Sequence, residues 1–356
     1  AVFKDLKNYW FLASLAMTPV ALALYSIRRK KNEKNIIIIG DTFVDIIACT
    51  DELPSWETDT VIEKPLKLML GGSGANTACH LTNAIKQNFN KAGAKIWPIS
   101  AQNLQCRLIT AIGSGPFGEF ARNSLKQRCV RIDHTLKKVR GEQGSCVVIT
   151  GRGKRGFLTY RGASGAFDGS NFNLDFVRRG DHVHVAGFFN MESLINDLPK
   201  ILKEARTRGA TLSLTPQYDA SEKWGGLDKI YPLLAHLILN ETEAMKLASS
   251  IENAGAAEYF LRKGVENVVI TRGELGASLY RFNRSKDVVD FHQKCRSVDS
   301  VDSTGAGDAF SAGFLLFWMI HRNFELALQW GCAYGTAAVQ IIGGSSTEPF
   351  LPKDLE

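Results

Sequence analysis

Residues 301–313 of the chain read VDSTGAGDAFSAG. Gly305, Ala306 and Gly307 stand immediately at the start of an apolar stretch, at about 306–320, that we expect to be helical. Glycines allow backbone N–H groups to approach an anion closely, and the N-terminus of a helix adds positive potential. Such a nest suits a phosphoryl group, whose negative charge is spread over its oxygens. These three residues are therefore a candidate anion-binding site.

Asp308 would fall in the first turn of that helix. A carboxylate at this place could accept a proton from an attacking hydroxyl, which makes Asp308 a candidate general base. The same stretch allows a simpler interpretation as a capped helix N-terminus, because Ser303, Thr304 and Asp308 all have capping chemistry. Both interpretations stay open from these residues alone.

Two segments nearer the N-terminus carry candidate groups for a ligand rich in hydroxyls. Gly71 and Gly72 form a second glycine turn before a predicted helix and would let a polyol approach the backbone, while Asn76 can both donate and accept hydrogen bonds. Asp45 follows a β-branched strand at 36–39 and could accept from two hydroxyls. An ordinary strand-to-helix turn and a solvated acidic loop are the alternatives.

Two further motifs come at the ends of predicted buried strands. Asn240 and Glu243 offer amide and carboxylate oxygens, which suit Mg²⁺, or they form a helix N-terminus with favourably placed acids. Thr271, Gly273 and Gly276 form a turn that could contact nucleotide phosphates, or a plain hairpin turn.

The rest of the body alternates between short apolar strands and helical stretches. This alternation predicts a mainly parallel sheet covered by helices on both faces, which is a three-layer α/β/α architecture. Hairpin patterns in parts of 45–70 and 145–163 predict a small separate β lid. Two apolar helices, at about 306–320 and 324–341, close the body.

Taken together, these motifs are similar to those of one family. From about Ile36 to Thr347 the chain resembles the ribokinase-like (PfkB) carbohydrate kinases. The resemblance rests on Gly71-Gly72 with Asn76, Asn240-x-x-Glu243, Thr271-x-Gly273-x-x-Gly276 and Asp302-Ser303-Thr304-Gly305-Ala306-Gly307-Asp308. Their occurrence in the family's order is more specific than any single motif.

The resemblance implies an ATP-dependent phosphotransferase that acts on a hydroxyl of a small sugar, sugar phosphate or nucleoside. By position, Asp308 is the base and the amides of Gly305, Ala306 and Gly307 are the anion hole. The resemblance further implies a K⁺ or similar monovalent cation beside the loop at Asp302. The remaining positions imply acceptor contacts at Asp45, Gly71, Gly72 and Asn76, ATP contacts at Asn240, Thr271, Gly273 and Gly276, and Mg²⁺ ordered by Asn240 and Glu243.

Some features depart from the family pattern or imitate other proteins. Gly115 stands where the family commonly has an acid, and residues 88–105 look inserted. Gly113-x-Gly115-x-x-Gly118 imitates a dinucleotide fingerprint, but a lone match in the middle of the chain is weak evidence, and no P-loop sequence is present. His182-x-His184 would share one strand face, as a metal pair or, more simply, as core histidines.

The N-terminal segment at 9–27 contains no charged residue. As a helix it would span about 28 Å, close to the thickness of the bilayer hydrocarbon. Four basic residues, 28–31, follow it and place the body on the cytosolic or mitochondrial matrix side. We therefore expect a single-pass membrane anchor in 1–34 and a kinase domain in 35–356. A removed import or signal segment and a buried core helix are the alternatives.

Composition narrows the range of partners. The net charge is +7, and seven basic and two acidic residues in 1–34 supply +5 of it, so the body is nearly neutral. That balance excludes a general nucleic-acid binder. Seven cysteines without a CxxC motif fit a reducing compartment and give no zinc pattern. The anchor motivates a second hypothesis, an accessory or structural subunit of a membrane complex with weak or no kinase activity, and a homodimer is the other assembly considered.

Overall fold

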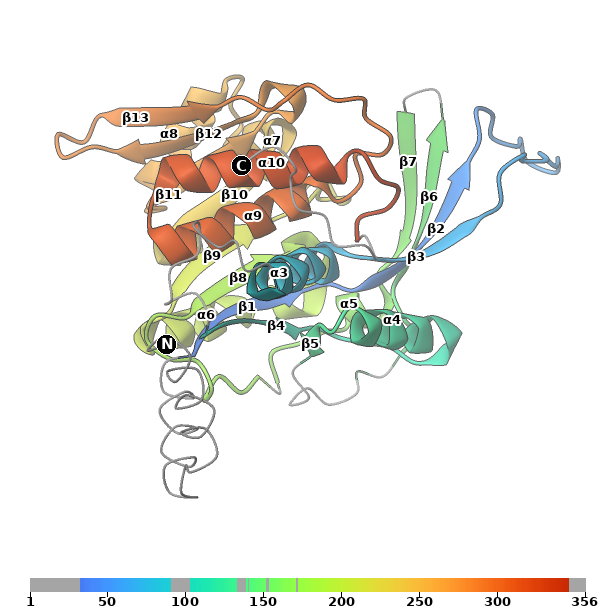
Figure 1. Cartoon of the computed structure of the whole chain (residues 1–356), viewed down its shortest axis with the longest axis horizontal. Coiled ribbons are helices and arrows are strands. Elements are labelled where there is room, and N and C mark those ends of the chain that lie inside the picture. Colours follow the sequence, from blue (N-terminus) through green and yellow to red (C-terminus); the bar gives the residue numbers. More distant parts are fainter. Residues whose placement is uncertain are drawn as a thin grey trace, which may run out of the picture.

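A nine-stranded sheet forms the middle layer, in the spatial order β13-β12-β11-β10-β9-β8-β1-β4-β5 (Figure 1). The computed structural model describes residues 33–90, 103–132, 139, 141–151, 154–170 and 172–345. All neighbours from β11 to β5 pair in parallel, and β12 and β13 are antiparallel additions at one edge. The strands are β1 (Lys34–Gly40), β4 (Leu104–Ile109), β5 (Arg131–Ile132), β8 (His182–Ala186), β9 (Thr211–Thr215), β10 (His236–Asn240), β11 (Asn267–Thr271), β12 (Ala277–Phe282) and β13 (Val288–Gln293).

Helices cover both faces of this sheet, which makes three layers (Figure 1). The four isoleucines Ile36–Ile39 of β1 are fully buried, because alternate side chains enter opposite cores. Ile36 and Ile38 join a core with α3 (Ser73–Asn90), α4 (Gly115–Gln127), α9 (Ala306–His321) and α10 (Phe324–Ala338). Ile37 and Ile39 join a core with α6 (Leu198–Thr207), α7 (Glu241–Ala248) and α8 (Asn253–Arg262). The α/β architecture expected from the sequence is confirmed.

A second sheet of four strands projects from one end of this body and forms a lid (Figure 1). Its order is β3-β2-β6-β7, with a parallel pair, β2 and β6, between two antiparallel edges. The strands are β2 (Phe43–Cys49), β3 (Lys67–Gly71), β6 (Ser145–Gly151) and β7 (Lys154–Tyr160). Only Asp41 and Thr42 separate β1 of the core from β2 of the lid, and both are buried.

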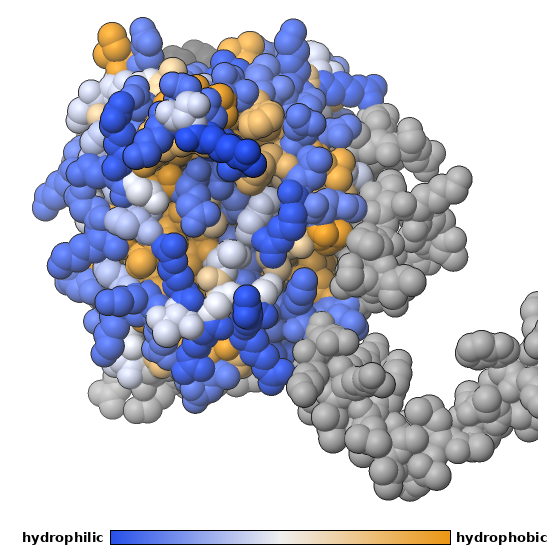
Figure 2. Space-filling model, turned by 90° about the vertical axis from the view of Figure 1, so that its left-hand side faces the viewer, coloured by the Kyte–Doolittle hydropathy of each residue, from blue (hydrophilic) through white to orange (hydrophobic). Residues whose placement is uncertain are grey.

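Exposed apolar side chains are concentrated on the lid. Five of them are Leu66, Leu68, Phe157, Leu158 and Tyr160, all at least 43% exposed. The face on the opposite side of the molecule, near β13, is largely hydrophilic, with hydrophobic residues scattered over it (Figure 2).

The expected membrane anchor needs correction. No helix of the described residues is long and apolar enough to cross a bilayer. The segment 9–27 itself lies outside the described residues. The described part of the chain therefore contains no transmembrane helix, and the single-pass, membrane-anchored location expected from the sequence is withdrawn.

Two of the expected departures fall near α3 and α4. The apparent insertion at 88–105 begins inside α3, which continues to Asn90, and residues 91–102 lie outside the described part. Gly115 is the first residue of α4 and has φ of +76°, a left-handed conformation that glycine adopts without strain.

Candidate active site

Asp308 lies in the first turn of α9 and is only 5% exposed. Its Oδ1 accepts hydrogen bonds from Ser73 Oγ at 2.6 Å and from Gln217 Nε2 at 3.2 Å, and its Oδ2 accepts one from Asn76 Nδ2 at 2.9 Å. Burial raises the pKa of Asp308, and the hydrogen bonds from Ser73 and Asn76 lower it; the net result is a pKa of about 6. The carboxylate is thus fixed in orientation and titrates near neutral pH, as a general base requires.

The loop before α9 is held in shape by Asp302. Asp302 Oδ1 accepts hydrogen bonds from Thr304 N at 2.9 Å and from Thr304 Oγ1 at 2.7 Å, and Oδ2 accepts one from Gly343 N at 2.9 Å. Gly305 has φ of +74°, and a Cβ there would lie 2.4 Å from Gly344 Cα. Only glycine fits this position. The backbone of the loop can therefore pass this close to Gly344 and lead directly into the N-terminus of a sixteen-residue helix.

The expected acceptor residues gather beside Asp308. A Cβ on Gly71 would lie 2.1 Å from Asp45 Oδ2, so Asp45 packs directly over that glycine. Burial, together with the smaller effects of the charges of Asp308 and Asp302, raises the pKa of Asp45 to about 7. Gly72 has φ of +92°, which a side chain rarely adopts. Asn76 Oδ1 is buried without a hydrogen-bond partner among the described residues and remains available to a ligand.

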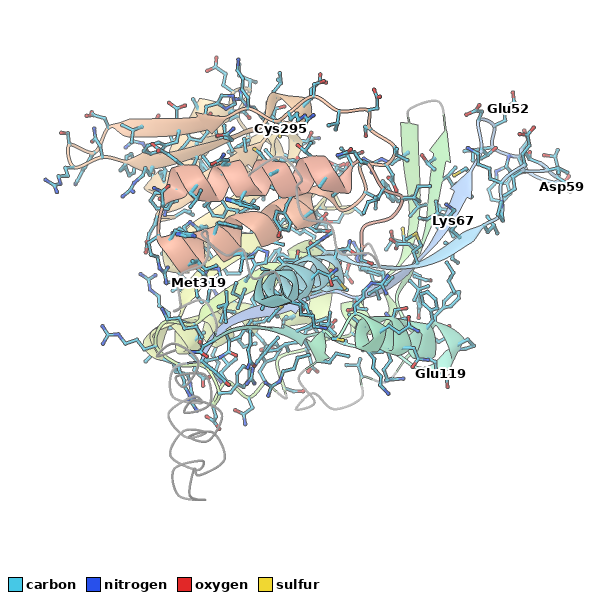
Figure 3. All side chains as sticks on the ribbon, in the orientation of Figure 1. Glu52, Asp59, Lys67, Glu119, Cys295 and Met319 are labelled. Atoms are coloured by element: carbon cyan, nitrogen blue, oxygen red, sulfur yellow. The ribbon has the colours of Figure 1, made fainter. Side chains whose placement is uncertain are left out.

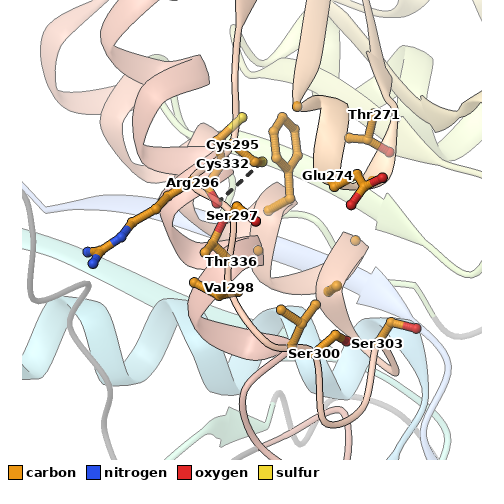
Figure 4. A pocket seen from close by; sticks show the side chains of 17 residues that line it. Thr271, Glu274, Cys295, Arg296, Ser297, Val298, Ser300, Ser303, Cys332 and Thr336 are labelled. Carbon is orange, nitrogen blue, oxygen red and sulfur yellow. Dashed lines mark hydrogen bonds between the residues drawn. The ribbon is translucent and has the colours of Figure 1, made fainter.

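A cavity on the other side of the loop is lined by three of the expected ATP residues, Thr271, Gly273 and Gly276 (Figure 4). The same cavity reaches Ala306 and Gly307 at the N-terminus of α9. It therefore connects the turn after β11 with the candidate anion hole. Its other walls are the segment after β13, including Arg296, Ser297 and Val298, and α10.

Asn240 and Glu243 do not line that cavity and instead cap α7. Asn240 Oδ1 accepts a hydrogen bond from Glu243 N at 2.9 Å, and Glu243 accepts bonds from Asn240 Nδ2 at 2.8 Å and Asn240 N at 3.2 Å. This is a capping box, the simpler of the two sequence interpretations. Burial, together with the smaller effect of the charge of Asp308, raises the pKa of Glu243 to about 7.

The side-chain oxygen atoms of Asn240 and Glu243 fit Mg²⁺ only in a limited way. No group of three or more His, Cys, Asp or Glu side chains in the described part of the chain could hold a metal. Mg²⁺ nevertheless needs only one or two carboxylates beside phosphates and water. The buried carboxylate of Glu243, which lies close enough to Asp308 for their charges to interact, fits a contact through water.

Sequence reasoning missed several contacts of the site. Asp41 accepts hydrogen bonds from Gly74 N at 2.9 Å and Asn190 Nδ2 at 2.6 Å, and burial raises its pKa to about 7. Gln217 reaches Asp308 from the segment after β9. Arg155 of the lid donates to Thr304 Oγ1 at 3.1 Å, so the lid touches the loop before α9. Ser73 lies in the glycine turn and Asp41 directly follows β1, so the sequence marks both places, whereas Gln217 and Arg155 have no local sequence signal.

The features that imitate other proteins have structural explanations. His184 Nδ1 and His182 Nε2 both bond to Ser213 Oγ, at 2.7 and 2.6 Å, and both rings are fully buried. Burial lowers the pKa of each histidine, which keeps the rings neutral. A Cβ on Gly118 would lie 2.1 Å from the carbonyl oxygen of Gly113, so the two glycines pack closely. His182 and His184 are therefore core histidines, and Gly113 and Gly118 belong to a tight turn.

Comparisons with known proteins agree with this geometry. The family model of pfkB family carbohydrate kinases matches residues 33–351. The ribokinase of Haemophilus influenzae is 25% identical over 311 residues, covering 84% of this chain and 90% of that protein. The solved structure of a putative ribokinase II from E. coli in complex with ATP and Mg²⁺ has a TM-score of 0.69 and 23% identity, over 88% of this chain and 94% of that one.

A second solved structure shows the same fold with a different name. The adenosine kinase of Sinorhizobium meliloti has a TM-score of 0.71 and 18% identity, over 89% of this chain and 97% of that one. At this identity the likeness concerns the fold alone. The match of the family model over most of the chain goes further, and this chain belongs to the pfkB family of ATP-dependent carbohydrate kinases.

Proposed function

We propose that the chain transfers the γ-phosphoryl group of ATP to a hydroxyl of a small sugar, sugar phosphate or nucleoside. One observation carries the proposal: Asp308 lies between two sets of binding groups. Ser73 and Asn76, which touch its carboxylate, belong to the glycine turn beside Asp45. Gly307, its neighbour in the chain, lines the cavity that also contains Thr271 and Gly273.

The mechanism follows from this arrangement. Asp45 and Asn76 Oδ1 accept hydrogen bonds from hydroxyls of the acceptor and hold it against Gly71 and Gly72. Asp308 takes the proton of the attacking hydroxyl as its oxygen bonds to the γ-phosphorus. The bond between that phosphorus and the β–γ bridging oxygen breaks, and ADP leaves. The amides at 305–307 face the charge that develops on the transferred group.

Two ions complete the proposed chemistry. Mg²⁺ would neutralise phosphate charge, with Glu243 and Asn240 contributing through water. The monovalent cation implied by the family resemblance belongs beside Asp302, whose oxygens hold Thr304 and Gly343 and keep the loop in shape. Activity measured with K⁺ against a large organic cation, at constant ionic strength, tests that ion separately.

Phosphoryl transfer from labelled ATP by the full chain tests the function. The acceptors are sugars, sugar phosphates, sugar acids and nucleosides, and Asp308→Asn is assayed beside the unchanged protein. A product from one acceptor class that the variant does not form supports the proposal and names the substrate. The same product from the variant removes Asp308 as base, and absence of both product and ATP binding in calorimetry overturns the proposal. No feature of the described residues favours the alternative of an accessory subunit.

A further inference from the structure

Two cysteines from different elements meet at one wall of the nucleotide cavity. Cys295 follows β13 and Cys332 lies in the middle of α10, and both line the cavity (Figure 4). Cys295 Sγ lies 4.0 Å from the backbone oxygen of Cys332, and Cys332 Sγ lies 3.7 Å from that of Gln293. Each thiol therefore reaches into the segment that carries the other. Figure 3 shows Cys295 on the main body, beside α10 and apart from the lid.

The two thiols differ in a way that gives them separate roles. Cys295 is partly exposed, whereas Cys332 is only 3% exposed. The hydrogen bond from the Cys332 thiol and a further one from Thr336 lower the pKa of Cys295 to about 7, and the same thiol–thiol contact raises the pKa of Cys332. Thiolates, not thiols, are the nucleophiles, so Cys295 is the reactive member.

None of the other five cysteines lines this cavity. Burial raises the pKa of Cys79 and Cys106 to about 12, so their thiols stay protonated. Cys146 is buried as well and its pKa is raised. Cys129 is exposed, and its sulfur lies 3.8 Å from a carbonyl oxygen of its own turn, Gln127 O. Cys129 is therefore a suitable internal control for exposure without a partner thiol.

We propose that Cys295 is an oxidation site within the nucleotide cavity, with Cys332 as its resolving thiol and a hydroperoxide as oxidant. The Cys295 thiolate attacks the peroxide oxygen, the O–O bond breaks, and a sulfenic acid and one alcohol or water result. Cys332 then attacks the Cys295 sulfur while its thiol proton passes to the leaving hydroxide, so that the S–O bond breaks and water leaves as the disulfide forms. The two thiols supply the two electrons that reduce the peroxide.

Oxidation at this place would act on nucleotide binding directly. The bond would tie the segment after β13 to α10, and both elements contribute to the cavity lining. Conversely, a bound nucleotide would shield Cys295 from reagents. This second statement rests on the proposed function, whereas the cross-link itself does not.

The test exposes the full chain to hydrogen peroxide, blocks the remaining thiols with a maleimide and identifies linked peptides by mass spectrometry. We expect a Cys295–Cys332 peptide that dithiothreitol removes. Cys332→Ser should leave a sulfenic acid on Cys295 that dimedone traps, and Cys129→Ser should behave as the unchanged protein. Oxidation of Cys129 before Cys295, or oxidised Cys295 without any link to Cys332 in the unchanged protein, would overturn the proposal.

Addition of an ATP analogue that cannot transfer its phosphoryl group separates this proposal from the proposed function. Slower oxidation of Cys295, with the rate at Cys129 unchanged, supports both. An unchanged rate at Cys295 with the cross-link still formed contradicts the nucleotide site and leaves the thiol pair supported. Nucleotide binding to the oxidised protein, measured by calorimetry, should be lost and should return on reduction, and undiminished binding would contradict the effect on the cavity.

Discussion

The hydroxyl of Ser73 donates a 2.6 Å hydrogen bond to Oδ1 of Asp308, although 235 residues separate the two in the chain. The bond joins the first residue of α3 to the first turn of α9. It places the glycine turn of the acceptor side and the candidate base in one rigid unit.

Replacement of Asp308 by Asn should abolish most of the turnover and leave ATP binding. The amide keeps the size and can still bond to its neighbours, but it cannot take a proton. General-base catalysis contributes typically 10²–10⁴-fold, so we expect kcat to fall within that range. Steady-state kinetics and calorimetry with ATP measure the two effects. Loss of ATP binding together with activity would show a structural role instead.

Replacement of Ser73 by Ala should shift the pH profile of the reaction. The bond from Ser73 lowers the pKa of Asp308, so its loss should raise that pKa above about 6. The base is then protonated at a higher pH, and the acidic limb of kcat/KM should move upward in pH. Ser124→Ala on α4 is the matched control, because Ser124 is buried away from the site. An unmoved limb would mean that Ser73 does not tune the base.

Replacement of Gly71 by Ala should weaken acceptor binding selectively. The new Cβ would fall 2.1 Å from Asp45 Oδ2, so the carboxylate must move. We expect KM for the acceptor to rise at least tenfold, about 1.4 kcal/mol, with the dissociation constant of ATP unchanged. Gly156→Ala on the same lid is the control, since no atom lies within 4 Å of a Cβ there. Equal effects of the two changes would refute the role of Asp45.

Replacement of Arg155 by Ala should loosen the lid without unfolding the protein. Its guanidinium bonds to Thr304 Oγ1 at 3.1 Å and lies 3.9 Å from Asp302 Oδ1, and the side chain is one-third exposed. Exposed ion pairs contribute at most about 1 kcal/mol to stability, so the melting temperature should hardly change. KM for the acceptor should rise several-fold, with Arg155→Lys between the two. Unchanged kinetics would show that this contact does not close the lid during turnover.

Replacement of Asp45 by Asn should stabilise the protein at high pH and weaken the binding of the acceptor. The folded pKa of Asp45, about 7, lies above its usual 3.8, so the folded state binds the proton more tightly than the unfolded one. Asp45 therefore destabilises the fold progressively as pH rises from about 4 through 7. We expect a gain of about 4 kcal/mol at pH 8 and about 1 kcal/mol at pH 4.5, measured by denaturant unfolding. An equal gain at both values would contradict the titration.

The sequence was most informative where residues of a motif act at one place. Gly71, Gly72 and Asn76 are local neighbours at the junction of β3 and α3, so a single turn brings them together. Gln217 and Asn190 escaped notice because they approach Asp308 and Asp41 from other loops, and nothing in their own neighbourhood marks them. Gln217 has φ of +66°, a backbone conformation that cannot be predicted from the residue type.

Two other expectations show the limits of local patterns. Asn240 and Glu243 have the chemistry of both a metal site and a capping box, and only the coordinates show which bonds form. The uncharged length of 9–27 and the basic residues 28–31 predicted a membrane helix, and no helix of the described residues is long and apolar enough to be one.

The two-residue link between β1 and β2 has a consequence for how the molecule unfolds. Thr42 N donates to Ser164 Oγ at 3.2 Å, Thr42 O accepts from Gln143 Nε2 at 2.5 Å, and Asp41 bonds to Gly74 and Asn190. Because these hydrogen bonds hold the link, it cannot act as a free hinge. We expect the base of the lid to belong to the same cooperative unit as β1, so that amides at the start of β2 exchange with solvent only when the core opens.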